Sequence, residues 1–166
     1  MKSPRLPLTH QLLFALFLLL SIALPAAKAQ SVEPLRATIL ISETIQTIGA
    51  PPCILQGNIS GTGVAARVGK VTLASTDCIN PLDPTFTIFS FASENVALSL
   101  ANGDQIFARY AGTFAVEDSI GVITGGYEIT GGTGHYAGAT GAGTVQGVED
   151  MTTGKGQIQL IVTISH

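Results

Sequence analysis

Glu43 is the side chain in this sequence whose position most suits chemistry. It shares an alternating strand face with Ile39 and Ile41, where an ionised carboxylate is costly unless it is paired or stays protonated. A carboxyl group whose pKa is raised in this way is suited to general acid or base catalysis inside a cavity. The alternatives are a bulge, a slipped register or an outward-facing strand face, each of which places Glu43 in solvent.

Two tyrosines could add hydroxyl groups to such a cavity. Tyr110 and Tyr127 both fall on the apolar side of their expected strands, so they are candidates for binding a ligand. The more ordinary role of a tyrosine in this position is in the core, with its hydroxyl hydrogen-bonded to a neighbour. Arg109 has the opposite parity and His135 lies in an expected turn, so we expect both at the surface.

The sequence lacks the residues that several other classes of reaction need. The sequence has no Gly-x-Ser-x-Gly elbow and no suitable Cys-His pair, so a covalent hydrolase is poorly supported. Beyond the N-terminal segment, His135 and His166 are the only histidines, and we therefore expect no multi-histidine metal site. We assign neither a metal nor a cofactor to the protein.

The first 29 residues have the layout of a secretory signal peptide. They combine a positively charged start, an apolar run over residues 12–24 and small residues around Ala29, which together favour cleavage near Ala29. A membrane anchor is the rival interpretation, but a spanning helix needs about 20 apolar residues, and this run is shorter and ends at Pro25. We therefore expect residues 1–29 to be removed and residues 30–166 to form one secreted or periplasmic domain.

The mature part of the chain carries a surplus of acids. Residues 30–166 keep five of the eight lysines and arginines but all eleven acids, a formal net charge of −6. Because contacts with phosphate need clustered cations, we expect no nucleic-acid partner and no membrane association of the mature form. A small apolar ligand and a homo-oligomer are both compatible with this composition.

Cys53 and Cys78 are the only cysteines, and both follow the signal segment. An exported protein meets oxidising conditions, in which an even number of cysteines indicates a disulfide. Such a bridge stabilises a fold by about 3 kcal/mol if it acts through chain entropy. Two buried free thiols are the alternative, and a redox pair is disfavoured because the spacing is not Cys-x-x-Cys.

The elements that must position these residues are β-strands. From Arg36 onward most segments alternate with period two, are rich in Ile, Val, Thr and Phe, and are interrupted by Gly, Asn, Asp or Pro, which is typical of strands and turns. We expect strands at residues 37–48, 53–63, 67–77, 86–91, 95–100, 105–116, 121–130, 143–148 and 157–164. Eight or nine short strands without a helix predict an antiparallel barrel or sandwich, and a barrel of about eight strands can hold one small ligand.

A glycine-rich stretch lies between two of these strands. Residues 131–143 read Gly-Gly-Thr-Gly-His-Tyr-Ala-Gly-Ala-Thr-Gly-Ala-Gly. They formally satisfy the loose dinucleotide-binding pattern, but that pattern delivers a pyrophosphate to a helix N-terminus, and the residues that follow here make a poor helix. A calcium-binding glycine repeat would need Asp where Tyr136 stands. The glycines are better explained by a tight turn and by the close approach of two strands.

The same stretch carries a family resemblance. The residues concerned are Gly131, Gly132, Thr133, Gly134, Tyr136, Gly138, Ala139 and Gly141. In this spacing they resemble the Gly-Gly-Thr-Gly-x-Phe-x-x-Ala-x-Gly signature of dirigent proteins, with Tyr136 in place of the usual Phe. They are also similar to the Gly-Gly-Ser-Gly turn of allene oxide cyclases. The match is convincing over about a dozen residues and looser from residue 102 to residue 147.

The resemblance implies an all-β fold, an antiparallel eight-stranded barrel with an apolar cavity and no cofactor. Dirigent proteins of this type steer the radical coupling of phenols, and the cyclases fold an unstable epoxide into a ring. Their cavity carboxylates lie outside the shared turn and are not matched to positions in this sequence. The motif therefore predicts a fold and a cavity, but no chemistry.

Two functions follow as expectations. The first is an exported, cofactor-free barrel that binds a small apolar molecule or a partner. The second is an isomerase or cyclase that acts on an apolar substrate in the cavity, with Glu43 as acid or base. A cavity lined by Glu43 and tyrosines favours the second function, whereas an interior packed solid with Ile, Val and Leu excludes a ligand in either.

Overall fold

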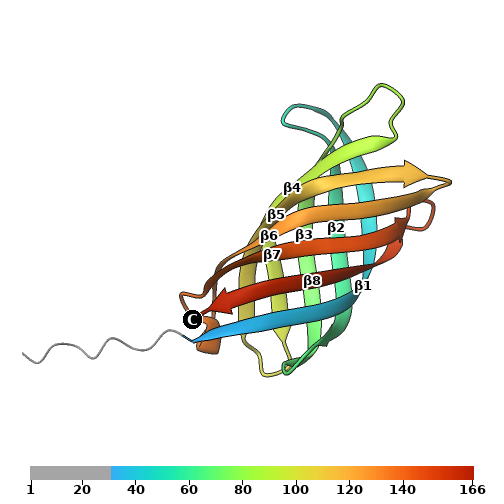
Figure 1. Cartoon of the computed structure of the whole chain (residues 1–166). Coiled ribbons are helices and arrows are strands. Elements are labelled where there is room, and N and C mark those ends of the chain that lie inside the picture. Colours follow the sequence, from blue (N-terminus) through green and yellow to red (C-terminus); the bar gives the residue numbers. More distant parts are fainter. Residues whose placement is uncertain (1–30) are drawn as a thin grey trace, which may run out of the picture.

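The computed structural model describes residues 31–166, which form one closed antiparallel β-barrel (Figure 1). Its strands are β1 (Val32–Ala50), β2 (Cys53–Ala65), β3 (Gly69–Pro81), β4 (Ile88–Leu100), β5 (Gln105–Glu117), β6 (Ile120–Gly132), β7 (Thr140–Asp150) and β8 (Lys155–Ser165). A 3-10 turn, η1 (Gly134–Tyr136), lies between β6 and β7. The expected eight-stranded, all-β barrel is confirmed. The expected signal peptide, residues 1–29, lies outside the described residues.

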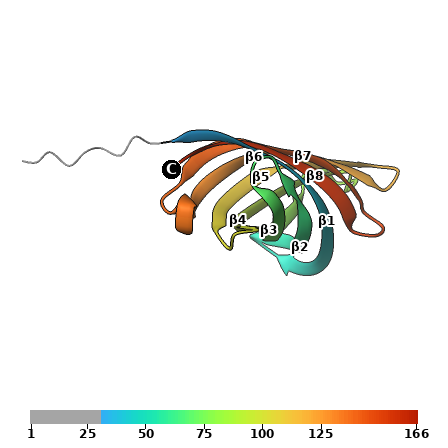
Figure 2. The ribbon, with the colours of Figure 1, turned by 90° about the horizontal axis from the view of Figure 1, so that it is seen from below.

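The strands follow one another around the barrel in the order of the sequence. Each pairs with its neighbours along the chain, and β8 returns beside β1 to close the sheet (Figure 2). On β1, Ile39 faces Gly63 of β2 on one side and Ile158 of β8 on the other. Closure leaves the sheet without a free edge. No helix among residues 31–166 is long and apolar enough to cross a membrane.

Side chains alternate between the inner and outer faces of each strand, and the inward-facing ones fill the interior of the barrel. On β1, Ile39 and Ile41 are buried whereas Leu40 between them is exposed, because successive side chains of a strand point to opposite faces. The other strands add mostly Ile, Leu, Val and aromatic side chains to the same core. Each large apolar side chain stabilises the fold by about 1.5–3 kcal/mol when it leaves water. If the pairing of a strand slipped by one residue, its apolar side chains would turn outward and its polar ones inward. Burial of the apolar side chains therefore fixes the register of the strands.

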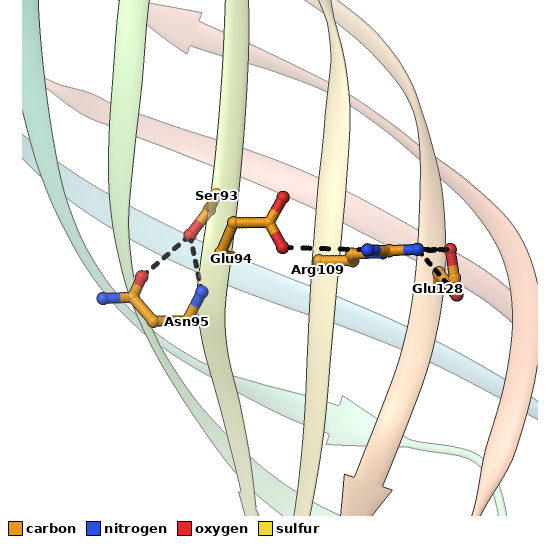
Figure 3. A network of polar contacts seen from close by, with 5 residues as sticks. All are labelled: Ser93, Glu94, Asn95, Arg109 and Glu128. Atoms are coloured by element: carbon orange, nitrogen blue, oxygen red, sulfur yellow. Dashed lines mark hydrogen bonds and ion pairs between the residues drawn. The ribbon is translucent and has the colours of Figure 1, made fainter. Parts of the chain in front are cut away.

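Strand β4 differs from the sequence-based prediction of two short strands at residues 86–91 and 95–100. It is a single strand with a bulge between Ser93 and Val96. The bulge moves the inward face from odd to even positions, so that Phe91 and Val96 are both buried. The Ser93 hydroxyl lies 2.9 Å from Oδ1 of Asn95 and accepts from the Asn95 backbone N–H at 3.4 Å (Figure 3).

Cys53 and Cys78 form a disulfide, as predicted. The bridge joins the start of β2 to the end of β3. A disulfide of this kind fits an oxidising compartment outside the cytoplasm.

The two ends of the barrel differ in how they are filled. The turns β1–β2, β3–β4, β5–β6 and β7–β8 surround one end, which we call the cavity end. At the other, the η1 end, lie the turn η1, the start of β1 and the end of β8 (Figure 1). Tyr136 of η1 and the nearby Ala139 belong to the buried core. The η1 end is therefore closed by packed side chains.

Candidate functional site

A cavity lies inside the barrel at the cavity end. Its volume is about 40 Å³, which is room for two or three water molecules at roughly 10–15 Å³ each. Most of its wall is apolar and includes Ile41 and the rings of Phe91 and Phe114. Three acids, Glu43, Asp77 and Glu149, also line it. The interior is thus not packed solid at this end, and the polar side chains there are these three acids and Tyr110.

Glu43 faces this cavity from β1, on the side that alternation predicts. Its carboxyl occupies the space opposite Gly57 of β2, where a Cβ would overlap Oε1 of Glu43. A glycine is needed at position 57 for this close approach. The backbone N–H of Glu43 donates to the carbonyl oxygen of Gly154 at 2.7 Å, which holds β1 against the β7–β8 turn. The backbone of Glu43 is therefore fixed from both sides.

Glu149 of β7 lies beside Glu43 with only strand β8 between their strands, and it is only 4% exposed. Burial, which has the largest effect, acts together with the charge of Glu149, a hydrogen bond with Glu149 and the charge of Asp77 to raise the pKa of Glu43 to about 8. Burial also raises the pKa of Glu149, but the hydrogen bond with Glu43 opposes that rise. Two carboxyls can share a hydrogen bond only when one keeps its proton. The pair therefore shares one proton, and the shared hydrogen bond raises the pKa of Glu43 while it lowers that of Glu149.

One oxygen of each member of this pair receives no hydrogen bond from an N–H or hydroxyl group of the protein. These oxygens, Oε1 of Glu43 and Oε1 of Glu149, are buried and have no such donor among residues 31–166. Buried polar atoms are nearly always paired in folded proteins. Two unpaired carboxyl oxygens beside an apolar cavity are therefore the feature of this site that most calls for a ligand.

Asp77 forms a separate hydrogen-bonded group beside the pair. The Tyr110 hydroxyl donates to Oδ1 of Asp77 at 2.6 Å, and the Ser75 hydroxyl donates to the same oxygen at 2.7 Å. Burial raises the pKa of Asp77, and the hydrogen bonds from Tyr110 and Ser75 partly offset that rise. Burial and the charge of Asp77 raise the pKa of Tyr110, so this tyrosine stays protonated and acts as a donor.

Of the two tyrosines that the sequence analysis proposed for ligand binding, only one lies at the cavity. Tyr110 lines the cavity with Glu43. Tyr127 is buried in the core, its ring centroid 6.1 Å from that of Tyr110, and it does not line the cavity. Its hydroxyl has no hydrogen-bond partner within the described part of the chain. The structure thus brings one of the two predicted tyrosines to the site.

Asp77 and Glu149 are site residues that the sequence reasoning missed. Asp77 has the parity of Leu73 and Ile79, and Glu149 has the parity of Val145, which is the signal that pointed to Glu43. Asp77 stood at the last position of its expected strand, and Glu149 lay one residue beyond the expected end of its own. Both strands continue further than expected, so the acids fall inside the barrel.

The glycine-rich motif lies at the η1 end, away from the cavity. Gly134 has a φ of 55°, and a Cβ there would overlap the carboxylate of Asp104. That carboxylate accepts from the backbone N–H of His135 at 3.2 Å, and the Thr133 hydroxyl accepts from the N–H of Gln105 at 2.8 Å. These contacts confirm the interpretation as a tight turn with close strand approach. The motif builds the barrel rather than the cavity.

Arg109 and His135 lie at the surface, as predicted. Arg109 sits on the outer face between Glu94 of β4 and Glu128 of β6 (Figure 3). Its Nη2 is 3.0 Å from Glu128, and its Nη1 is 3.9 Å from Glu94. Exposed ion pairs of this kind contribute little to stability, because water and salt screen them. This cluster is therefore a solvated surface feature and not part of the cavity.

No family model and no curated protein matches this chain. Among solved structures the barrel is similar to that of a pterocarpan synthase dirigent protein, with a TM-score of 0.54 and 12% sequence identity, over 82% of this chain and 89% of that chain. At this identity the similarity concerns the fold alone. The likeness to allene oxide cyclases stays a prediction. Residues 31–166 therefore adopt a dirigent-like eight-stranded β-barrel fold.

Proposed function

We propose that this barrel binds a small, mostly apolar molecule that carries a hydroxyl or carbonyl group. The observation that carries the proposal is the pair of unpaired, buried oxygens on Glu43 and Glu149 beside an apolar wall. Leaving such atoms without partners costs about 1–3 kcal/mol for each group. A polar group on a ligand can supply the missing hydrogen bonds, while Phe91 and Phe114 contact its apolar part.

The direction of the strands supports one orientation for this ligand. On β1 and β7, the acids Glu43 and Glu149 come after the wall residues Ile41 and Val145, and both strands run toward the cavity end. The acids therefore lie nearer to the entrance than Ile41 or Val145. The apolar part of the ligand enters first, and its polar group stays level with the acids.

A ligand larger than a few water molecules needs side chains to move aside. Met151, in the β7–β8 turn, lines the cavity, and its sulfur lies 2.9 Å from where a Cβ on Gly121 would stand. Methionine is flexible and adapts to neighbours of different shape. We infer that rotation of Met151 enlarges the space for a ring-sized molecule.

The binding proposal is tested by titrating the mature protein with a monocyclic phenol, followed by NMR. We expect Glu149→Gln to weaken phenol binding about tenfold, because one charge-assisted hydrogen bond is worth about 1.5 kcal/mol or more. Glu94→Gln is the matched control, since Glu94 is an exposed acid on the outer face, and it should bind as the wild type does. Absence of phenol binding at millimolar concentration, or equal binding by all three proteins, would contradict the proposal.

A second function is favoured by the unequal protonation of the pair. Neighbouring acids whose pKa values are pushed apart suit one as proton donor and the other as proton acceptor. Glu43 would give its proton to an oxygen of the substrate, Glu149 would remove one from a carbon, and their hydrogen bond would return the proton to Glu43. This is a cofactor-free isomerisation. It becomes a cyclisation when the deprotonated carbon bonds to the carbon that carries the protonated oxygen and that C–O bond breaks, so that the oxygen leaves as a hydroxyl group. The similar solved structure is named a synthase, which is a reason to test ring-forming substrates.

The acid role of Glu43 predicts how such an activity depends on pH. Glu43 must be protonated to act, and its pKa is about 8. We expect turnover of a ring-forming substrate to decline as the pH rises above about 8. A pH–rate profile measured from pH 6 to pH 10 tests this expectation. An activity that stays constant over this range would remove Glu43 as the acid.

We further infer that the protein acts outside the cytoplasm, secreted or periplasmic, after cleavage near Ala29. The disulfide between Cys53 and Cys78 supports this compartment. N-terminal sequencing of the exported protein would give the cleavage point directly.

A further inference from the structure

Three residues from distant parts of the sequence converge at the η1 end of the barrel. They are Glu33 at the start of β1, His135 in η1 and His166 just after β8. Figure 1 shows η1 beside the start of β1 and the end of β8. The ring centroids of His135 and His166 are 4.2 Å apart, and Nε2 of His166 lies 3.4 Å from Oε1 of Glu33. One ligand atom from each residue lies within 4.8 Å of the other two.

We propose that Glu33, His135 and His166 bind a zinc ion. Two imidazoles and one carboxylate form a ligand set that zinc uses in proteins, with the fourth position open to water. Tetrahedral zinc with bonds of about 2.0–2.1 Å separates neighbouring ligand atoms by roughly 3.4 Å. The pair of His166 and Glu33 already has this spacing.

The remaining ligand is free to complete the site. His135 is exposed, so rotation of its side chain can shorten its distance to the other two ligand atoms without disturbing the core. The side chain of His166, in contrast, is only 7% exposed. The site thus has two positioned ligands and one that can close onto the ion.

Hydrogen bonds from neighbouring residues hold the positioned ligands. The Tyr136 hydroxyl donates to Oε1 of Glu33 at 3.2 Å. The Ser31 hydroxyl lies 3.1 Å from Nε2 and 3.3 Å from Nδ1 of His166, so it can pair with Nδ1 when Nε2 binds the ion. The backbones of Ser31 and His166 also pair, at 2.9 Å and 3.0 Å. Outer hydrogen bonds of this kind orient the groups that bind a metal. From the number of histidines we expected no multi-histidine metal site, and this proposal departs from that expectation. The grouping has no sequence signal, because only barrel closure brings β1, η1 and β8 together.

Zinc binding is tested by calorimetric titration of the mature protein with zinc chloride in a buffer without chelators. We expect one zinc ion per chain, with affinity reduced at least tenfold in His135→Ala and in Glu33→Gln, since loss of a ligand removes a bond to the ion. Glu94→Gln, which alters an exposed acid elsewhere, should bind zinc as the wild type does. So should Glu149→Gln, which separates this site from the proposed cavity function.

Thermal unfolding gives a second measurement that does not depend on calorimetry. A ligand that binds only the folded barrel raises the unfolding midpoint, so zinc should raise it in the wild type and in Glu94→Gln but not in His135→Ala. Magnesium, which prefers oxygen ligands, should leave all three unchanged. Absence of zinc binding at 1 mM, or binding that His135→Ala does not weaken, would overturn the proposal.

Discussion

Replacing Tyr136 with alanine is expected to lower the free energy of unfolding by about 3–5 kcal/mol, the cost of truncating a large buried aromatic side chain. Tyr136 is 4% exposed and belongs to the core at the η1 end. Its ring centroid lies 5.2 Å from those of both His135 and His166. Alanine would remove these contacts and open the closed end of the barrel to water.

Urea unfolding at pH 7 measures this loss, and Tyr136→Phe is the matched control. Phenylalanine keeps the ring and removes only the hydroxyl that donates to Glu33 at 3.2 Å, which should cost about 1 kcal/mol. It is also the residue that the resembling dirigent signature has at this position. If both variants lost the same small amount, Tyr136 would not be the residue that closes this end.

Replacing Glu43 with glutamine is expected to stabilise the barrel at alkaline pH by about 3 kcal/mol and to leave its stability at pH 4.5 nearly unchanged. The folded barrel holds the proton of Glu43 with a pKa of about 8, against an ordinary value of 4.5. The stability linked to this tighter proton binding is fully present below pH 4.5 and is lost as the pH rises through 8. At 1.36 kcal/mol for each pH unit the full loss is about 5 kcal/mol, and partial exposure of Glu43 reduces it to about 3 kcal/mol.

The measurement is urea unfolding of wild type and Glu43→Gln at half-unit steps from pH 4.5 to pH 9. Other acids and histidines titrate in both proteins, so the difference between the two curves reports Glu43 together with Glu149, whose pKa depends on its hydrogen bond with Glu43. Glu94→Gln should follow the wild type within about 0.5 kcal/mol, because the side chain of Glu94 is 81% exposed. Parallel curves for wild type and Glu43→Gln would show that burial of this acid has no energetic consequence.

Local alternation predicted those parts of the site that lie on one strand. The parity of β1 placed Glu43 with Ile39 and Ile41 on the inner face, and the parity of β5 placed Tyr110 inside and Arg109 outside. Turn residues were equally local signals. For these features the sequence pattern was sufficient, because each depends on residues within one strand or one turn.

Contacts between residues on strands that are not paired with each other could not be predicted in the same way. Glu43 and Glu149 lie on β1 and β7, which are not paired with each other, so their meeting depends on barrel closure and strand tilt. In β4, the polar run around Glu94 was read as a gap between strands, whereas a bulge lets the strand continue. His135 and His166 likewise meet only after β8 has closed against β1. No periodicity in the sequence carries this information.

The packing of Tyr136 over the η1 end means that the cavity has its entrance at the other end. A molecule that enters past Met151 must leave by the same route, so a product blocks the next substrate until it departs. If the barrel is an enzyme, product release then sets an upper limit on its turnover. If it is a carrier, the same geometry makes its cargo exchange one molecule at a time.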